Sequence, residues 1–281
     1  MNGTETDAKY LVEIKPPKSW VRVDFQELWQ YRELLAAFVG RNIRVRYKQT
    51  VIGIGWAIFQ PLITMIIFTI FFGRLAGIPS DNVPYPIFVY AGLLYWTFFS
   101  TALSGASFSM IESGNMLQKV YFPRLITPLS AALTPAVDFA ISLAVLFGLM
   151  ALYRYSPSLV GLALIPVLMA CTILAVLGPG LFLAALNVKF RDVRYILPFF
   201  IQMLLFVTPV IYPVSIIPEQ FRWLAFLNPM SGIITVARNS LLGGGSVDWL
   251  SLAVSVGISL VLFIGGLAYF KKTELFFADI I

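Results

Sequence analysis

Histidine is absent from the 281 residues of this chain, and only one cysteine, Cys171, is present. Without histidine the chain cannot build a Ser-His-Asp triad, a histidine general base or a histidine metal site. One cysteine cannot form an internal disulfide, and alone it cannot hold a zinc or iron–sulfur centre. Because Cys171 lies inside an apolar run, we interpret it as a small core residue. The commonest catalytic and metal chemistries are therefore excluded.

Charged residues are also scarce. They make up 12% of the chain, whereas apolar residues make up 59%. An average soluble domain has about 25% charged and roughly 45–50% apolar residues. One water-soluble core of this composition would leave too few polar side chains to cover its outside, which argues against a cytosolic globular enzyme. We expect lipid to be the solvent for most of the chain.

Long uncharged stretches separate the charges, for example 25 residues between Lys48 and Arg74 and 34 between Arg154 and Lys189. A charge at the bilayer centre costs several kcal/mol and a span needs about 20 uncharged residues, so such stretches predict membrane helices. The pattern predicts an all-α membrane protein with six spans, near 51–73, 86–111, 126–152, 160–186, 196–212 and 249–270. A bend is expected at residues 178–180, Gly-Pro-Gly, in the fourth span.

Lysine and arginine are divided unequally between the two sides of these spans. One side holds sixteen of the twenty, and the other holds Arg74, Arg154, Arg222 and Arg238. Short loops rich in lysine and arginine stay in the cytoplasm, so both termini are predicted to be cytoplasmic. The net charge of +6 is then a signal of topology and not of nucleic-acid binding. We expect the first span to serve as the insertion signal.

Residues 1–50 read as a cytoplasmic N-terminal arm and residues 51–281 as a six-helix transmembrane domain. In the arm, Asp24 and Glu27 have the spacing of a capping pair that opens a helix. An amphipathic stripe follows, which predicts a helix along the membrane surface. The stripe consists of Phe25, Leu28, Tyr31, Leu35, Phe38, Val39 and Ile43. A surface anchor is one interpretation, and a helix that also borders a cytoplasmic partner protein is the other.

A cluster of basic residues ends the arm just before the first span. It consists of Arg41, Arg44, Arg46 and Lys48. Anionic head groups attract each such charge by about 1 kcal/mol, so the cluster predicts contact with membrane lipid.

The loop between the second and third spans, residues 112–124, is short and ends with proline and arginine. It has more apolar surface than a turn requires, which suits a short helix that docks into a groove. A plain connecting turn is the alternative. The apolar residues are Met116, Leu117, Val120, Tyr121 and Phe122.

Two stripes of aromatic and amide residues lie along one face of the first and of the fifth predicted span. They consist of Trp56, Gln60, Thr64 and Phe68, and of Phe199, Gln202, Met203 and Phe206. Such a lining suits a neutral or weakly charged glycan that passes without tight binding, although helix packing explains the stripes almost as well. Further aromatics, which could stack on sugars or only mark the membrane interface, gather near the second span. They are Tyr85, Phe88, Tyr90, Tyr95, Trp96, Phe98 and Phe99.

Asp138 is the one charge near the middle of the predicted spans. Intramembrane carboxylates are candidates for pathways or proton relays. A relay needs a second titratable group at similar depth, and the remaining spans offer none. We therefore interpret Asp138 as hydrogen-bonded to a neighbouring helix.

The segment between the fifth and sixth spans, residues 213–248, is too long for a turn and too apolar for a free loop. It predicts two short helices that dip back into the outer leaflet.

Six pieces of the chain, in order, carry a resemblance to a known family. They are RxRYKxTxxGxxW at 44–56, KVYFPR at 119–124, NVKFRDVR at 187–194, TPVIYP at 208–213, NP at 228–229 and FFADI at 276–280. The chain resembles the membrane subunits of type-2 ATP-binding-cassette exporters of the polysaccharide, O-antigen or teichoic acid class. The resemblance runs from about residue 25 to the end.

This resemblance implies a half-transporter in the bacterial plasma (inner) membrane, in which two copies form the path for a lipid-linked glycan and two separate ATPase subunits bind the cytoplasmic face. It implies that residues 113–123 form the coupling helix, that 25–39 form the interface helix with Leu28, Tyr31, Leu35 and Phe38, and that the first and fifth spans form the channel wall. It also implies re-entrant helices that shape the exit. The residues expected at the ATPase interface are Met116, Leu117, Lys119, Val120, Tyr121, Phe122 and Arg124.

The chain itself has no means of hydrolysing ATP by the usual phosphate-binding loop. That loop needs Gly-Lys-[Ser/Thr], and none of the eight lysines follows a glycine. We therefore expect no cofactor in this chain, with ATP and magnesium on the partner ATPase.

Two readings from other classes stay open. A membrane enzyme acting on lipid-linked sugars would need paired acidic residues, whereas the loops offer only isolated carboxylates. A proton-coupled transporter is disfavoured because the predicted spans lack the buried titratable groups that such a transporter needs. Among exporters, a teichoic acid or capsule system is the alternative to O-antigen.

Overall fold

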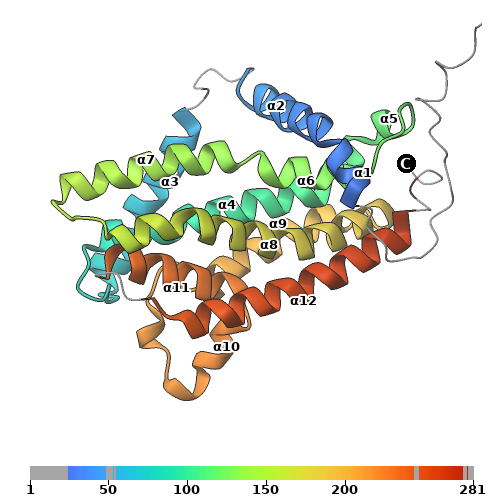
Figure 1. Cartoon of the computed structure of the whole chain (residues 1–281). Helices are drawn as coiled ribbons and strands as arrows, with labels where there is room; N and C mark the ends of the chain where they lie inside the picture. The colour runs from blue at the N-terminus through green and yellow to red at the C-terminus, as the bar shows by residue number, and fades with distance from the viewer. Residues whose placement is uncertain (1–24, 49–52, 54, 244–246, 275–276, 278–281) are drawn as a thin grey trace, which may run out of the picture.

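The computed structural model describes residues 25–48, 53, 55–243, 247–274 and 277. All regular structure in these residues is helical (Figure 1). The first half contains α1 Phe25–Gln30, α2 Arg32–Lys48, α3 Gly55–Phe68 with its π-helical extension η2 Thr69–Leu75, α4 Tyr85–Glu112, α5 Gly114–Leu117, α6 Ile126–Leu133 and α7 Ala136–Leu152. The second half contains α8 Leu159–Lys189, α9 Val193–Val207, η3 Val214–Ile216, η4 Glu219–Phe221, α10 Arg222–Phe226, α11 Pro229–Leu242 and α12 Trp249–Glu274.

Within the described residues, five helical stretches are long and apolar enough to cross a membrane. They are Gly55–Leu75, Tyr85–Glu112, Ile126–Leu152, Leu159–Lys189 and Trp249–Glu274. These match five of the six predicted spans within a few residues. The remaining predicted span, the fifth along the chain at 196–212, corresponds to the 15-residue helix α9, which is shorter than the roughly 20 residues a span needs. Six crossings, and with them the side of each terminus, therefore stay a prediction.

Helix α9 ends early for a local reason. Thr208 precedes Pro209, and a residue before proline is disfavoured in the α conformation. Thr208 is accordingly extended, with φ −76° and ψ 136°, and the chain leaves the helix there. By contrast, α8 continues through Pro166 and Pro179, so residues 178–180 do not end the fourth span.

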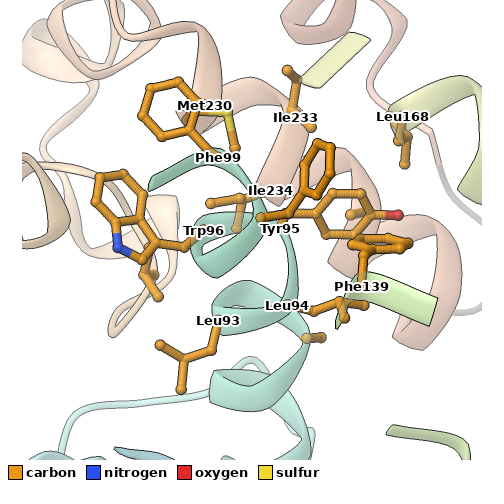
Figure 2. Close-up of a cluster of buried hydrophobic side chains, with 14 of the residues drawn as sticks. Leu93, Leu94, Tyr95, Trp96, Phe99, Phe139, Leu168, Met230, Ile233 and Ile234 are labelled. Carbon is orange, nitrogen blue, oxygen red and sulfur yellow. The ribbon is translucent and has the colours of Figure 1, made fainter. Parts of the chain in front are cut away.

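Helix α4 forms the centre of the subunit. It packs against α3, α6, α7, α8, α9 and α11. In its apolar membrane-spanning stretch 78% of the residues are buried, whereas 28% or less are buried in the other four spans. Figure 2 shows Leu93, Leu94, Tyr95, Trp96 and Phe99 of α4 among side chains of α7, α8 and α11. This corrects one expectation, because the aromatics near the second span lie inside the subunit. Only Tyr85 among the seven is half-buried, and the other six are buried.

The predicted pair of short helices before the last span is present as α10 and α11. The side chain of Asn228 caps α11 by accepting a hydrogen bond from the backbone N–H of Met230 at 3.1 Å. Helix α11 packs between α4, α8 and α12 and is almost wholly buried, whereas α10 exposes Trp223 and Leu224. Their depth in the bilayer stays a prediction.

Helices α8 and α12 touch backbone to backbone at Gly178 and Gly266. A methyl group at Gly266 would overlap the carbonyl of Gly178, whereas one at the neighbouring Gly265 would meet open space. We expect Gly266→Ala to destabilise the protein by about 1–3 kcal/mol, because the two helices must separate. Thermal unfolding of the purified protein measures this. Gly265→Ala is the control, and equal unfolding midpoints for the two variants would contradict the close contact.

Candidate functional site

The loop between α4 and α6 has an exposed tip. Its side chains Lys119, Val120 and Tyr121 point away from the subunit, with Val120 and Tyr121 exposed by 58% and 67%. Figure 1 shows α5, which precedes this tip, at the same end of the bundle as α1 and the last turns of α12. A basic, an apolar and an aromatic side chain thus stand together on one protrusion.

The other apolar residues of this loop face inward. Phe122 is buried and meets Phe38 of α2 edge to face, with ring centroids 5.4 Å apart. The cluster also contains Ile126 and takes in Leu28, Tyr31, Leu34, Leu35, Met116 and Leu117. The predicted interface-helix residues Leu28, Tyr31, Leu35 and Phe38 therefore support the loop and α6 from inside the chain. Contact of this stripe with a partner protein stays a prediction.

Arg124 belongs to a different contact. Its guanidinium donates a hydrogen bond to the backbone carbonyl of Glu274 and lies 5.9 Å from the ring centroid of Phe277. Glu274 is in turn paired with Lys271 at 2.7 Å. Arg124 therefore joins the loop to the end of α12. Its partner Glu274 is 150 residues away in the chain, so no local sequence pattern predicts the contact.

The two predicted path stripes lie mainly on the outside of the subunit. Trp56, Gln60, Phe199, Gln202, Met203 and Phe206 are exposed, while Thr64 and Phe68 are half-buried. Helix α3 packs on α4 and α7, and α9 packs on α4 and α8, so neither has the other as a main packing partner. Within one subunit the two stripes therefore do not face each other across a path.

Both helices leave large apolar faces uncovered. The exposed large apolar side chains besides those of the stripes are Phe59, Ile63, Ile66, Ile67, Ile70, Phe71 and Leu75 on α3 and its extension, and Tyr195, Ile196, Phe200 and Val207 on α9. Exposed apolar patches of this extent mark membrane or protein contacts.

Asp138 lies in the first turn of α7 and is bound by the end of α2. Its carboxylate is 2.8 Å from the guanidinium of Arg46, and it accepts a hydrogen bond from the hydroxyl of Tyr47. Burial raises the pKa of Tyr47 to about 12, and Asp138 acts in the same direction, so the phenol keeps its proton at neutral pH. The predicted hydrogen bond of Asp138 to a neighbouring helix is confirmed, but its partners come from the N-terminal arm.

A cavity of about 140 Å³, which we call the α2–α7 cavity, is bordered by Arg46, Tyr47 and Asp138. Trp56 and Gln60 of α3 line it from another side, and the hydroxyl of Ser142 donates to the carbonyl of Ala57 at 3.3 Å. The remaining lining residues are Gly53, Ala57, Pro61, Leu94, Thr97, Phe98, Thr101, Pro135 and Phe139. The cavity therefore joins one predicted path stripe to an ion pair between an exposed arginine and a partly buried carboxylate.

Arg238 forms a second polar centre, which we call the Arg238 clamp. Although its side chain was expected among the outer-loop charges, Arg238 lies on α11 and is only 5% exposed. Its guanidinium donates to the carbonyl of Phe88 at 3.0 Å, to that of Pro209 at 2.6 Å, and to that of Val210. It also lies 3.8 Å from the ring centroid of Phe88.

Neighbouring residues complete this clamp. Gly92 leaves the space for Arg238, since a methyl group there would overlap the guanidinium. The hydroxyl of Tyr85 donates to the carbonyl of Ile211 at 2.8 Å, and Asn228 donates to the hydroxyl of Thr208 at 2.7 Å. The turn that follows the path-stripe helix α9 is thus held to α4 and α11 by side chains that sequence reasoning did not connect.

The family model for ABC-2 type transporters matches residues 33–242, more than half of the chain. An O-antigen export system permease protein RfbA from Klebsiella pneumoniae is 29% identical over 250 residues, which cover 89% of this chain and 95% of that protein. RfbA from Myxococcus xanthus is 30% identical over 257 residues, 90% and 97% of the two chains. The polysialic acid transport protein KpsM from Escherichia coli is 24% identical over 238 residues, 83% and 91%. The chain therefore belongs to the ABC-2 type transporter family, as a membrane permease subunit and not an enzyme.

Proposed function

We propose that this chain is the membrane-spanning subunit of an ATP-driven exporter that moves a lipid-linked polysaccharide of the O-antigen type out of the cytoplasm across the bacterial plasma membrane. The observation that carries the proposal is the similarity to O-antigen permeases over about nine-tenths of the chain. Similarity to KpsM favours a second candidate cargo, a capsule-type polymer.

The functional unit contains two copies of this chain and two ATPase subunits. The exposed apolar faces of α3 and α9 support a second copy, because a path between these stripes needs a wall that one subunit does not supply. Since no lysine follows a glycine in this chain, ATP and magnesium bind to the partner subunits.

The loop between α4 and α6 transmits the work of the ATPase. Lys119, Val120 and Tyr121 form the tip that enters a groove of the ATPase, and the inward residues Met116, Leu117 and Phe122 join the tip to α1 and α2. Arg124 joins the same loop to the end of α12. A push on the tip therefore reaches three helices at once, with both termini on the cytoplasmic side.

The test is a strain that lacks the gene for this chain. We expect the deletion to abolish surface polysaccharide and to leave lipid-linked polymer in the cytoplasm, and the wild-type gene to restore export. The chain should copurify with an ATPase, and loss of ATP hydrolysis in that partner should stop export. The proposal fails if surface polysaccharide persists in the deletion strain or if no ATPase copurifies.

A further inference from the structure

The α2–α7 cavity has room for one six-membered ring. Its volume of about 140 Å³ is close to the roughly 150 Å³ of an engineered protein cavity that admits benzene. Its walls come from α2, α3, α4 and α7, so four separate segments define its shape. A ligand larger than one ring would have to extend out of the cavity.

The lining favours a polyhydroxylated ring over an acyl chain. Asp138 offers about four lone-pair directions, of which Arg46 and Tyr47 occupy two, and a guanidinium carries five N–H donors. The amide of Gln60 and the hydroxyls of Thr97, Thr101 and Ser142 add further donors and acceptors. Sugar hydroxyls donate and accept at once and can satisfy such a mixed set, whereas an alkyl chain would cover these polar groups without offering them hydrogen-bond partners.

The charges in the cavity favour a neutral ring over an anionic one. Arg46 and Asp138 compensate each other at 2.8 Å, so an incoming phosphate or uronate meets a carboxylate as well as a guanidinium. A better place for anions lies on another face of α2, where Arg41, Arg44 and Lys48 share a groove. Among the described residues, no carboxylate pairs with these three cations.

The aromatic wall of the cavity opens toward the predicted path. Trp56 is half exposed, and Phe59 meets its ring edge to face at 5.8 Å, which supports the indole from one side. Gln60, one turn further along α3, lines the cavity and is exposed as well. A ring in the cavity can therefore remain joined to a chain that runs along the face of α3.

We propose that the α2–α7 cavity is a binding subsite for one neutral pyranose ring of the transported glycan. This inference rests on the proposed function, because it takes the glycan to pass along α3. Trp56 stacks on the ring, Gln60 and Ser142 hydrogen-bond its hydroxyls, and the Arg46–Asp138 pair binds a vicinal diol.

The test measures sugar binding to the full-length chain with its ATPase in lipid nanodiscs by saturation-transfer difference NMR. The probes are neutral methyl pyranosides of glucose, galactose, mannose and rhamnose, with methyl glucuronide and inorganic phosphate as anionic competitors. Two variants alter the cavity. Gln60→Leu replaces the exposed glutamine by a side chain of similar size that has no amide. Ser142→Leu places a larger side chain in the cavity and so fills it. The matched controls are Gln220→Leu and Ala140→Leu, at exposed residues that do not line the cavity.

We expect at least one neutral pyranoside to bind, and its affinity to fall roughly two- to tenfold in Gln60→Leu, as for the loss of one hydrogen bond, with a further loss in Ser142→Leu. The controls should bind as the wild type does, and the anions should not displace the sugar. Unchanged binding in Gln60→Leu, displacement by phosphate, or no binding of any pyranoside would overturn the subsite. Surface polysaccharide in the same strains separates the two proposals: normal export without sugar binding rejects the subsite alone, whereas no loss of export on deleting the gene rejects the proposed function.

Discussion

Replacing Lys119 by glutamate and Tyr121 by alanine together is expected to reduce polysaccharide export by about tenfold or more while the ATPase continues to hydrolyse ATP. Both side chains stand on the exposed tip of the loop between α4 and α6 and make no part of the internal cluster around Phe122. Central aromatic residues of interfaces typically contribute about 2 kcal/mol or more to binding, which exceeds a tenfold change in affinity. Surface polysaccharide and ATP turnover measured on the same membranes give both values.

Tyr153→Ala is the control for this double variant, because Tyr153 is an exposed tyrosine in the turn after α7, outside the loop. It should leave export and ATP turnover unchanged. If the double variant exports normally, the tip does not transmit the work of the ATPase.

Arg124 is not part of this double variant, although the sequence puts it in the same docking motif. The structure joins its guanidinium to the carbonyl of Glu274 and to the ring of Phe277. A charge reversal at Arg124 would therefore disturb the end of α12 as well as the loop, and a loss of export in that variant could not be assigned to the tip.

Arg238→Met is expected to abolish export and to lower the yield of folded protein strongly. The substitution removes the donors for the carbonyls of Phe88, Pro209 and Val210 in a buried place. Each buried group left unsatisfied costs about 1–3 kcal/mol, so the sum is a large part of the stability of most proteins. Thermal unfolding in detergent and the surface polysaccharide of the complemented deletion strain measure the two effects.

Two further variants test the geometry of this clamp. Arg238→Lys should be intermediate, because an ammonium is a point charge that cannot reproduce the planar fork of the guanidinium. Arg222→Met is the control, since Arg222 also donates to a backbone carbonyl, that of Ile217, but lies at the surface on α10 and should change stability by less than about 0.5 kcal/mol. Equal stabilities for Arg238→Met and Arg222→Met would contradict the clamp.

The prediction of membrane spans succeeded because the lipid environment requires long uncharged helices, which can be recognised in the sequence. Five of the predicted spans are present as long apolar helices because uncharged length is a property that each stretch has by itself. The prediction for the fifth span was too long by the residues after Val207, where Thr208-Pro209 breaks the helix. The pair of short helices before α12 was also predicted, from the length and apolar character of the segment.

The sequence by itself determined that this chain is a helical membrane protein of the ABC-2 type that has no Gly-Lys-[Ser/Thr] motif, because composition, charge spacing and local motifs carry that information residue by residue. Only the tertiary structure decided which polar groups meet: Arg46 with Asp138, Arg124 with Glu274, and Arg238 with Phe88. Each of these contacts joins segments far apart in the chain, and a contact between two distant residues depends on how all the intervening helices pack. The same packing turned the aromatics of α4 into a core and left the stripes of α3 and α9 on the outside.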